Sequence, residues 1–157
     1  MKKDERYELL YKQIESLVEG ESNRIGVLAN VSAAMKELFP EAYFWVGFYL
    51  VDTEANVLRL GPFQGTVACY TIPNGKGVCG SAWAQRQTLV VPDVEAFPGH
   101  IACSSLSRSE IVVPLFNHHS EMVSPCAVWG VLDIDSTDLA TFDDTDRRWL
   151  ERIGSLL

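Results

Sequence analysis

The chain has 157 residues and a mass of 17.5 kDa, and its 47% hydrophobic and 22% charged residues are typical of an ordinary globular domain. Its 13 basic and 21 acidic residues give a net charge of −8, which disfavours nucleic acid and anionic membrane surfaces as partners. No apolar run reaches the ~20 residues of a membrane-spanning helix and no signal peptide is recognisable, so we expect a cytoplasmic protein of one domain.

Two amphipathic helices are predicted in the N-terminal third of the chain. Apolar side chains recur at helical spacing over residues 4–19, and Gly20 ends that pattern. A second helix is expected to begin at about Ser22, acting as its N-cap, and to end before Pro40.

Strands are predicted through the middle of the chain. Residues 42–52, rich in aromatic and β-branched side chains, indicate a buried strand with Trp45 and Tyr49 on one face, in a hairpin with residues 57–63. Further strands are expected at residues 67–72, 88–91, 110–116 and 127–135, with a short helix at 78–86. A capping signal at Thr141–Asp144 begins a closing helix. Short connections favour an antiparallel sheet covered by helices, an α+β domain.

A long loop, residues 92–109, separates two of these strands, and its length favours a functional role. It carries Cys103, with His100 and Arg108 nearby in sequence, and such surroundings can favour a thiolate. An unreactive loop cysteine is the commoner alternative. The four cysteines form no C-x-x-C pair, which argues against a structural zinc site, and they are Cys69, Cys79, Cys103 and Cys126. Cys126 opens a buried strand and is interpreted as a core residue.

Acidic residues gather at the end of the last predicted strand. Trp129, Val131, Asp133 and Asp135 are expected to share a face, so an apolar stripe ends in two acids. This indicates either the solvated end of the strand or a pocket for an ammonium group, and the pattern alone leaves both open. Glu110 begins the neighbouring strand and could join them.

The segment GKGVCG, residues 75–80, matches the pattern G-x-G-x-x-G. A dinucleotide site also needs a βαβ unit, whereas the strands here are expected to be antiparallel. A tight turn with a close helix–sheet contact is therefore preferred, and a nucleotide-dependent oxidoreductase remains an alternative.

Taken together, six segments resemble the free methionine-(R)-sulfoxide reductases, which are built on the GAF domain. These segments are WVGFYL (45–50), GPFQG (61–65), IPNGKGVCG (72–80), VPDVEAFPGHIACSS (91–105), SEIVVPL (109–115) and GVLDIDS (130–136). The resemblance covers about residues 42–147. It implies a single GAF-like domain over residues 1–157, an α+β fold in which N- and C-terminal helices pack on a central antiparallel sheet. It also implies reduction of free L-methionine-(R)-sulfoxide to L-methionine.

The resemblance assigns a role to each of three cysteines. Cys103 attacks the sulfoxide sulfur and becomes a sulfenic acid, Cys79 is the resolving thiol, and Cys69 passes the disulfide to thioredoxin. Thioredoxin is in turn reduced with NADPH by its reductase. No bound cofactor or metal is expected. Because members of the family often form homodimers, the resemblance also implies a homodimer.

The resemblance also assigns Glu110, Asp133 and Asp135 to substrate binding, and Trp45 and Tyr49 to aromatic contacts with the substrate. A free amino acid offers an α-ammonium group, and each charged hydrogen bond to it contributes roughly 1.5–3 kcal/mol. Peptide-bound methionine sulfoxide lacks that group, so the acids would select the free amino acid. Repulsion among them raises a pKa, which makes a neutral Glu110 the candidate proton donor to the sulfoxide oxygen.

Two features depart from the family. The loop at residues 117–125 is extended, and Cys126 lies outside the family's redox set. The main alternative to an enzyme is a GAF-type binding module, whose pocket senses a small molecule without catalysis.

Overall fold

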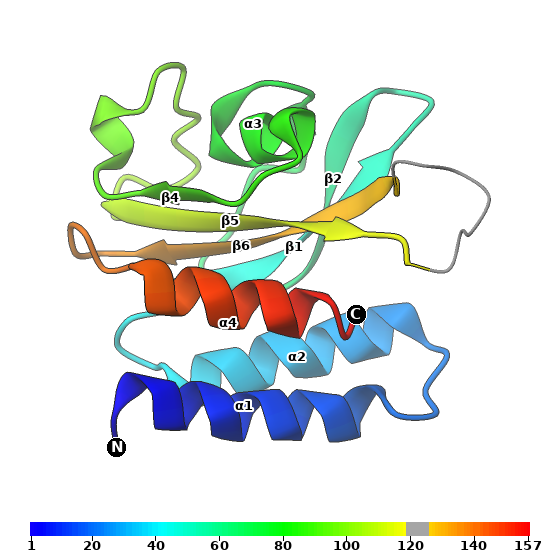
Figure 1. Cartoon of the computed structure of the whole chain (residues 1–157). Coiled ribbons are helices and arrows are strands. Elements are labelled where there is room, and N and C mark those ends of the chain that lie inside the picture. The colour runs from blue at the N-terminus through cyan, green and yellow to red at the C-terminus, as the bar shows by residue number, and fades with distance from the viewer. Residues whose placement is uncertain (119–125) are drawn as a thin grey trace.

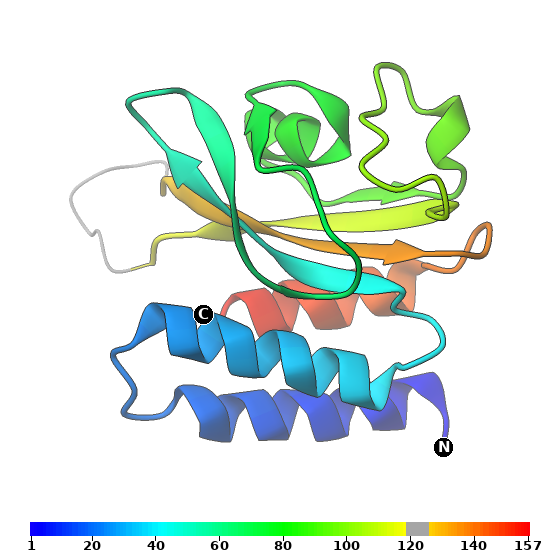
Figure 2. The same cartoon turned by 180° about the vertical axis from the view of Figure 1, so that it is seen from behind.

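The computed structural model describes residues 1–118 and 126–157. A six-stranded sheet separates two layers (Figure 1). Helices α1 (Lys3–Val18), α2 (Arg24–Leu38) and α4 (Asp144–Gly154) lie on one face, and α3 (Gly77–Gln85) lies on the other (Figure 2). Within the described ranges no helix is long and apolar enough to cross a membrane. Most of the extended loop at 117–125 lies outside these ranges.

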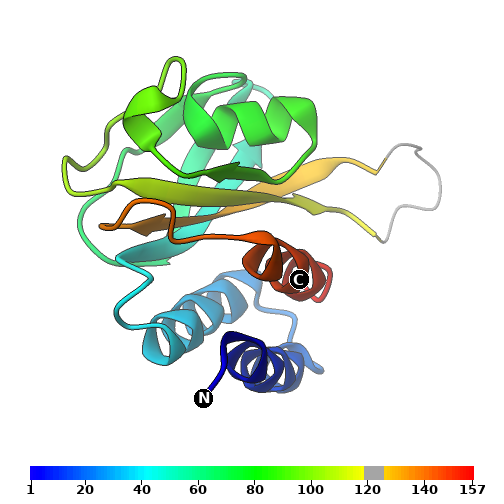
Figure 3. The same ribbon diagram turned by 60° about the vertical axis from the view of Figure 1, so that its left-hand side comes forward.

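The sheet has the order β3-β2-β1-β6-β5-β4, and each neighbouring pair is antiparallel. Its strands are β1 (Trp45–Asp52), β2 (Val57–Gln64), β3 (Thr71–Pro73), β4 (Leu89–Val91), β5 (Ser109–Phe116) and β6 (Val128–Ser136). The predicted α+β fold with an antiparallel sheet and packed terminal helices is confirmed. Figure 3 shows the sheet between its two covering layers, with the three-helix layer below the sheet.

The glycine-rich segment 75–80 forms the turn into α3. Gly77 has a φ of +61°, which glycine adopts most readily, and a Cβ on Gly80 would lie 2.5 Å from the Pro73 carbonyl oxygen. Glycine therefore allows the helix to approach the sheet closely. Because all strand pairs in the described ranges are antiparallel, this turn lies outside any βαβ unit, and the nucleotide-dependent alternative loses its structural basis.

Residues of β1 alternate between two hydrophobic clusters. Val46 and Phe48 pack with the three-helix layer, and Trp45 and Tyr49 pack on the α3 side, as the strand pattern predicted.

Trp129 lies on the opposite face from the one predicted. Val128 pairs with Phe116 while Gly130 pairs with Leu115, which leaves Trp129 as an extra residue in β6. Such a bulge interrupts the alternation of side chains. The indole therefore packs with the helical layer, beneath the Arg24 guanidinium, whereas Val131 returns to the α3 side.

Two predicted helix caps are wrong by one or two residues. The N-cap of α2 is Asn23, whose side chain accepts a hydrogen bond from the Gly26 amide at 3.2 Å, and not Ser22. The N-cap of α4 is Asp143, which forms a reciprocal capping box with Asp146. Both errors arise because more than one residue near each helix start is of a type that can act as N-cap.

The strand predicted at 67–72 is reduced to the three residues of β3. Cys126 is half-buried and lies in neither hydrophobic cluster, so its interpretation as a core residue is wrong. Its carbonyl accepts a hydrogen bond from Arg86.

Candidate active site

A pocket lies on the α3 side of the sheet, and it brings together residues from strands, helix and loops. Seven of the eight predicted site residues line it: Trp45, Tyr49, Cys79, Cys103, Glu110, Asp133 and Asp135. The eighth, Cys69, is joined to Cys103 by a disulfide and directly follows Val67 and Ala68, which also line the pocket. Residues that are distant in sequence thus form one site.

The register of the neighbouring strands β5 and β6 brings the acids together. Glu110 of β5 pairs with Asp135 of β6, and Asp133 lies two residues before Asp135, on the same face. Glu110 and Asp133 are only 5% and 6% exposed, while Asp135 is half-buried. The acids therefore form the floor of a pocket, and the alternative of a solvated strand end is excluded.

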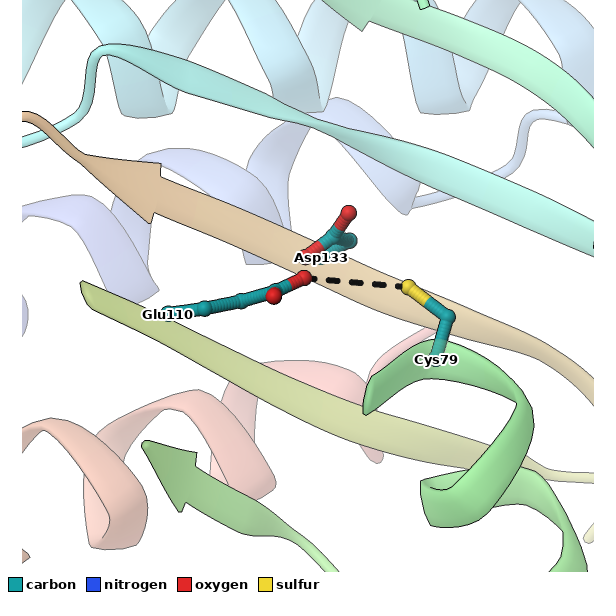
Figure 4. A group of neighbouring side chains, drawn as sticks. All are labelled: Cys79, Glu110 and Asp133. Atoms are coloured by element: carbon teal, nitrogen blue, oxygen red, sulfur yellow. Dashed lines mark hydrogen bonds between the residues drawn. The ribbon is translucent and has the colours of Figure 1, made fainter. Parts of the chain in front are cut away.

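Cys79 reaches the same acids from the first turn of α3 (Figure 4). Its thiol donates a long hydrogen bond to Glu110 Oε2 at 4.0 Å. One ligand atom from each of Cys79, Glu110 and Asp133 lies within 4.8 Å of the others, so these residues could hold a metal ion. Asp133 Oδ1 is buried and has no hydrogen-bond partner. The same arrangement could hold an ammonium group.

Burial raises the pKa of Glu110 and of Asp135 well above their ordinary values, and the charge of Asp133 adds to both shifts. Burial also raises the pKa of Asp133, although hydrogen bonds from Glu110 and Cys79 oppose that shift. No lysine or arginine is among the described residues that line the pocket. The acids must therefore be neutralised by protons or by a bound cation.

Two groups, His100 and Arg108, are expected from the sequence to favour a thiolate at Cys103, which is bonded to Cys69 in this structure. His100 lines the pocket, but burial lowers its pKa, which favours the neutral imidazole. Arg108 is not among the lining residues. The thiol of Cys79 is also a poor nucleophile, because burial and then the neighbouring acids raise its pKa well above the ordinary value.

The disulfide joins Cys69 to Cys103, with Cα atoms 5.5 Å apart. The expected first pairing was between Cys103 and Cys79, but Cys79 is a free, buried thiol. Exposure explains the difference: Cys69 and Cys103 lie on two outer loops, while Cys79 lies among the acids on the floor.

Trp45 and Tyr49 have a role that the sequence did not reveal. They line the pocket, yet they are only 4% and 2% exposed. Trp45 Nε1 donates a hydrogen bond to the Thr66 carbonyl, and the Tyr49 hydroxyl donates one to the Cys69 carbonyl, each at 3.0 Å. The polar groups of buried Trp and Tyr side chains usually have a hydrogen-bond partner, and this tendency is the one sequence signal for such a role. The aromatic pair therefore holds the Cys69 segment over the pocket, outside the β3 ladder.

Comparison with known proteins identifies similar chains over nearly the full length. The family model for the GAF domain matches residues 23–157. "GAF domain-containing protein A" of Dictyostelium discoideum is 57% identical over 155 residues, 99% of this chain and 92% of that protein. Free methionine-R-sulfoxide reductase of Escherichia coli K12 is 44% identical over 157 residues, 100% of this chain and 89% of that protein.

A solved structure agrees with these matches. The crystal structure of free methionine-R-sulfoxide reductase from Neisseria meningitidis in complex with its substrate superimposes with a TM-score of 0.91 at 51% identity. That match covers 99% of this chain and 88% of the other.

Proposed function

The chain belongs to the GAF-domain family, and we propose that it is an oxidoreductase that reduces free L-methionine-(R)-sulfoxide to L-methionine. The observation that carries this proposal is the Cys69–Cys103 disulfide beside a pocket floored by three carboxylates. The substrate class is supported by relatives named free methionine-R-sulfoxide reductase, 44% identical in Escherichia coli and 41% identical in Saccharomyces cerevisiae.

Substrate binding is assigned to the acids on the floor. Asp133 Oδ1 is an unpaired buried acceptor, and the α-ammonium of a free amino acid would supply its missing donor. Each such charged hydrogen bond contributes about 1.5–3 kcal/mol. A peptide-bound residue has no α-ammonium, so it would leave the acids unpaired and bind poorly. The apolar walls formed by Phe44, Ile72 and Ile101 suit the side chain of the substrate.

The chemistry is assigned to Cys103, which lines the same pocket as the acids. Its thiolate attacks the sulfoxide sulfur, and protonation of the sulfoxide oxygen by neutral Glu110 assists the step. Oxygen passes to Cys103 as a sulfenic acid, and the thioether of methionine is released. The Cys69 thiol then attacks the sulfenic sulfur, so that a disulfide forms and water leaves. In the present structure Cys69, and not Cys79, is the sulfur bonded to Cys103, so Cys69 replaces Cys79 as the proposed resolving thiol.

Recycling is assigned to a dithiol protein of the thioredoxin type, itself reduced with NADPH by its reductase. Large apolar side chains beside the two bonded cysteines are exposed to solvent: Val67 at 88%, Tyr70 at 83% and Leu106 at 58%. Exposed apolar groups are typical of protein interaction sites. A partner thiolate attacks the Cys69 sulfur and releases the Cys103 thiolate, and the second partner thiol then displaces Cys69. This route requires no cofactor bound to the chain.

The proposal is tested by NADPH consumption in a coupled thioredoxin system with four compounds. We expect turnover of the free R isomer, and little or none of the free S isomer, the N-acetylated R isomer or a peptide-bound sulfoxide. A binding module without catalysis would instead bind the free amino acid and consume no NADPH.

A further inference from the structure

We propose that Cys79, Glu110 and Asp133 form a site for a thiophilic divalent cation, Zn²⁺, and that its occupancy excludes the amino group of the substrate. Metal binding is inferred from the side chains themselves. Competition with the substrate rests on the function proposed above.

The geometry of the three side chains suits a single ion. One ligand atom from each lies within 4.8 Å of the others, and Cys79 Sγ lies 4.0 Å from Glu110 Oε2. Tetrahedral zinc, with bonds of about 2.3 Å to sulfur and 2.0 Å to oxygen, separates such ligand atoms by roughly 3.5 Å. Side-chain adjustments of about 1 Å would complete the coordination. The ligands come from α3, β5 and β6, so a packed framework holds them (Figure 4).

The second observation is the unpaired oxygen of Asp133. Asp133 is only 6% exposed, and its Oδ1 has no hydrogen-bond partner. A buried carboxylate oxygen without a partner is costly, and the described lining offers no lysine or arginine to supply one. A cation in the pocket would therefore relieve an existing electrostatic cost.

The ligand types select the metal. A thiolate with two carboxylates is a mixed soft and hard set, which suits Zn²⁺, whereas Mg²⁺ and Ca²⁺ bind through oxygen ligands. Three protein ligands leave the fourth tetrahedral position to water, as in zinc sites in which the ion exchanges its fourth ligand with solvent or substrate. The expected ion is accordingly an exchangeable inhibitor and not a structural element.

The site is present when the outer cysteines are oxidised. Cys79 remains a free thiol while Cys69 and Cys103 are bonded to each other. Metal binding by the disulfide form therefore reports on Cys79, without interference from the sulfur atoms of the other two.

The experiment uses the full-length disulfide form, stripped of metal, with Co²⁺ as a spectroscopic probe and Zn²⁺ in competition with a chromophoric chelator. We expect one ion per chain and a thiolate-to-cobalt charge-transfer band. Cys79→Ser should abolish the band and weaken Zn²⁺ binding by more than tenfold, because loss of even an outer-shell partner of a metal ligand costs about 10- to 100-fold. The matched control is Cys126→Ser, which changes the other free cysteine. It should bind like the wild type.

Glu110→Gln provides a second variant and should also weaken Zn²⁺ binding, with circular dichroism verifying the fold of each protein. Equal affinity in Cys79→Ser and wild type, or loss of binding in Cys126→Ser, would overturn the site. L-methionine should raise the apparent dissociation constant for Zn²⁺ more than an equal concentration of glycine, which chelates Zn²⁺ in solution through the same groups but lacks the side chain; absence of this difference contradicts the competition. Metal-free protein that lacks reductase activity contradicts the proposed function alone. Active protein that fails to bind Zn²⁺ contradicts this inference alone.

Discussion

Glu110 of β5 and Asp135 of β6 stand directly opposite each other in neighbouring antiparallel strands, on the pocket side of the sheet. Like charges in such a cross-strand pair destabilise a sheet. With Asp133 beside them, the floor of the pocket is stable only when protons or a cation reduce its negative charge. Such an electrostatic cost is relieved when a cationic ligand binds, so the cluster of acids indicates a binding site.

The stability of the ligand-free protein should therefore fall as the pH rises. Burial holds the pKa values of Glu110 and Asp135 well above those of the unfolded chain, so the folded state binds more protons between the two sets of values. The stabilising effect is present near pH 4 and is lost as the pH rises through the folded values. Asp135→Asn should flatten this dependence and raise the melting temperature at pH 8. A melting temperature of the wild type that rises from pH 5 to pH 8, with Asp135→Asn following in parallel, would contradict the pKa assignment.

Glu110→Gln tests the proton donor. Glutamine keeps the shape of the side chain but cannot donate the carboxylic proton, so kcat should fall roughly hundredfold, which is typical of a lost general acid. Steady-state kinetics with free L-methionine-(R)-sulfoxide would show this change. Unchanged kcat with unchanged KM would remove Glu110 from that role.

Tyr49→Phe tests whether the hydroxyl holds the Cys69 segment in position. Removing the hydrogen bond to the Cys69 carbonyl costs about 0.5–1.5 kcal/mol, so disulfide formation should slow by roughly two- to tenfold. Methionine release in the first step should be unaffected, and the sulfenic acid should accumulate and react with dimedone. Tyr70→Phe, at an exposed tyrosine, is the matched control. Equal dimedone labelling in both variants would show that the hydroxyl has no positioning role.

The exposed apolar side chains beside the disulfide should matter only for a protein reductant. Tyr70→Ala combined with Leu106→Ala should raise the KM for thioredoxin about fivefold, as expected for loss of roughly 1 kcal/mol at an interface. Turnover with dithiothreitol should be unchanged, because a small reductant needs no docking surface. Leu9→Ala, an exposed leucine on α1, is the control. Equal losses with both reductants would point to damage within the pocket and not to docking.

Much of the fold could be predicted from local patterns. The alternation that separates Trp45 and Tyr49 from Val46 and Phe48 is a property of one strand, and the structure preserves it. Trp129 was misplaced because a bulge changes the alternation, and a bulge depends on the partner strand.

The chemistry of the site was less accessible from the sequence. Acidic residues are rare on a buried strand, so the sequence indicated Asp133 and Asp135 as candidate site residues, but their roles came from the family resemblance. The pairing of Cys69 with Cys103 depends on how two loops meet in space, which spacing along the chain cannot reveal. The hydrogen bonds of Trp45 and Tyr49 to the Cys69 segment were missed for the same reason.

The proposed roles of Cys103 and Cys69 are tested most directly by a single turnover without reductant. Fully reduced protein is mixed with one equivalent of free L-methionine-(R)-sulfoxide, the methionine released is counted, and the disulfide is mapped by mass spectrometry. We predict one methionine per chain and a disulfide between Cys69 and Cys103, with neither product in Cys103→Ser. Methionine release by Cys103→Ser at the wild-type rate, or a product disulfide that lacks Cys103, would contradict these roles.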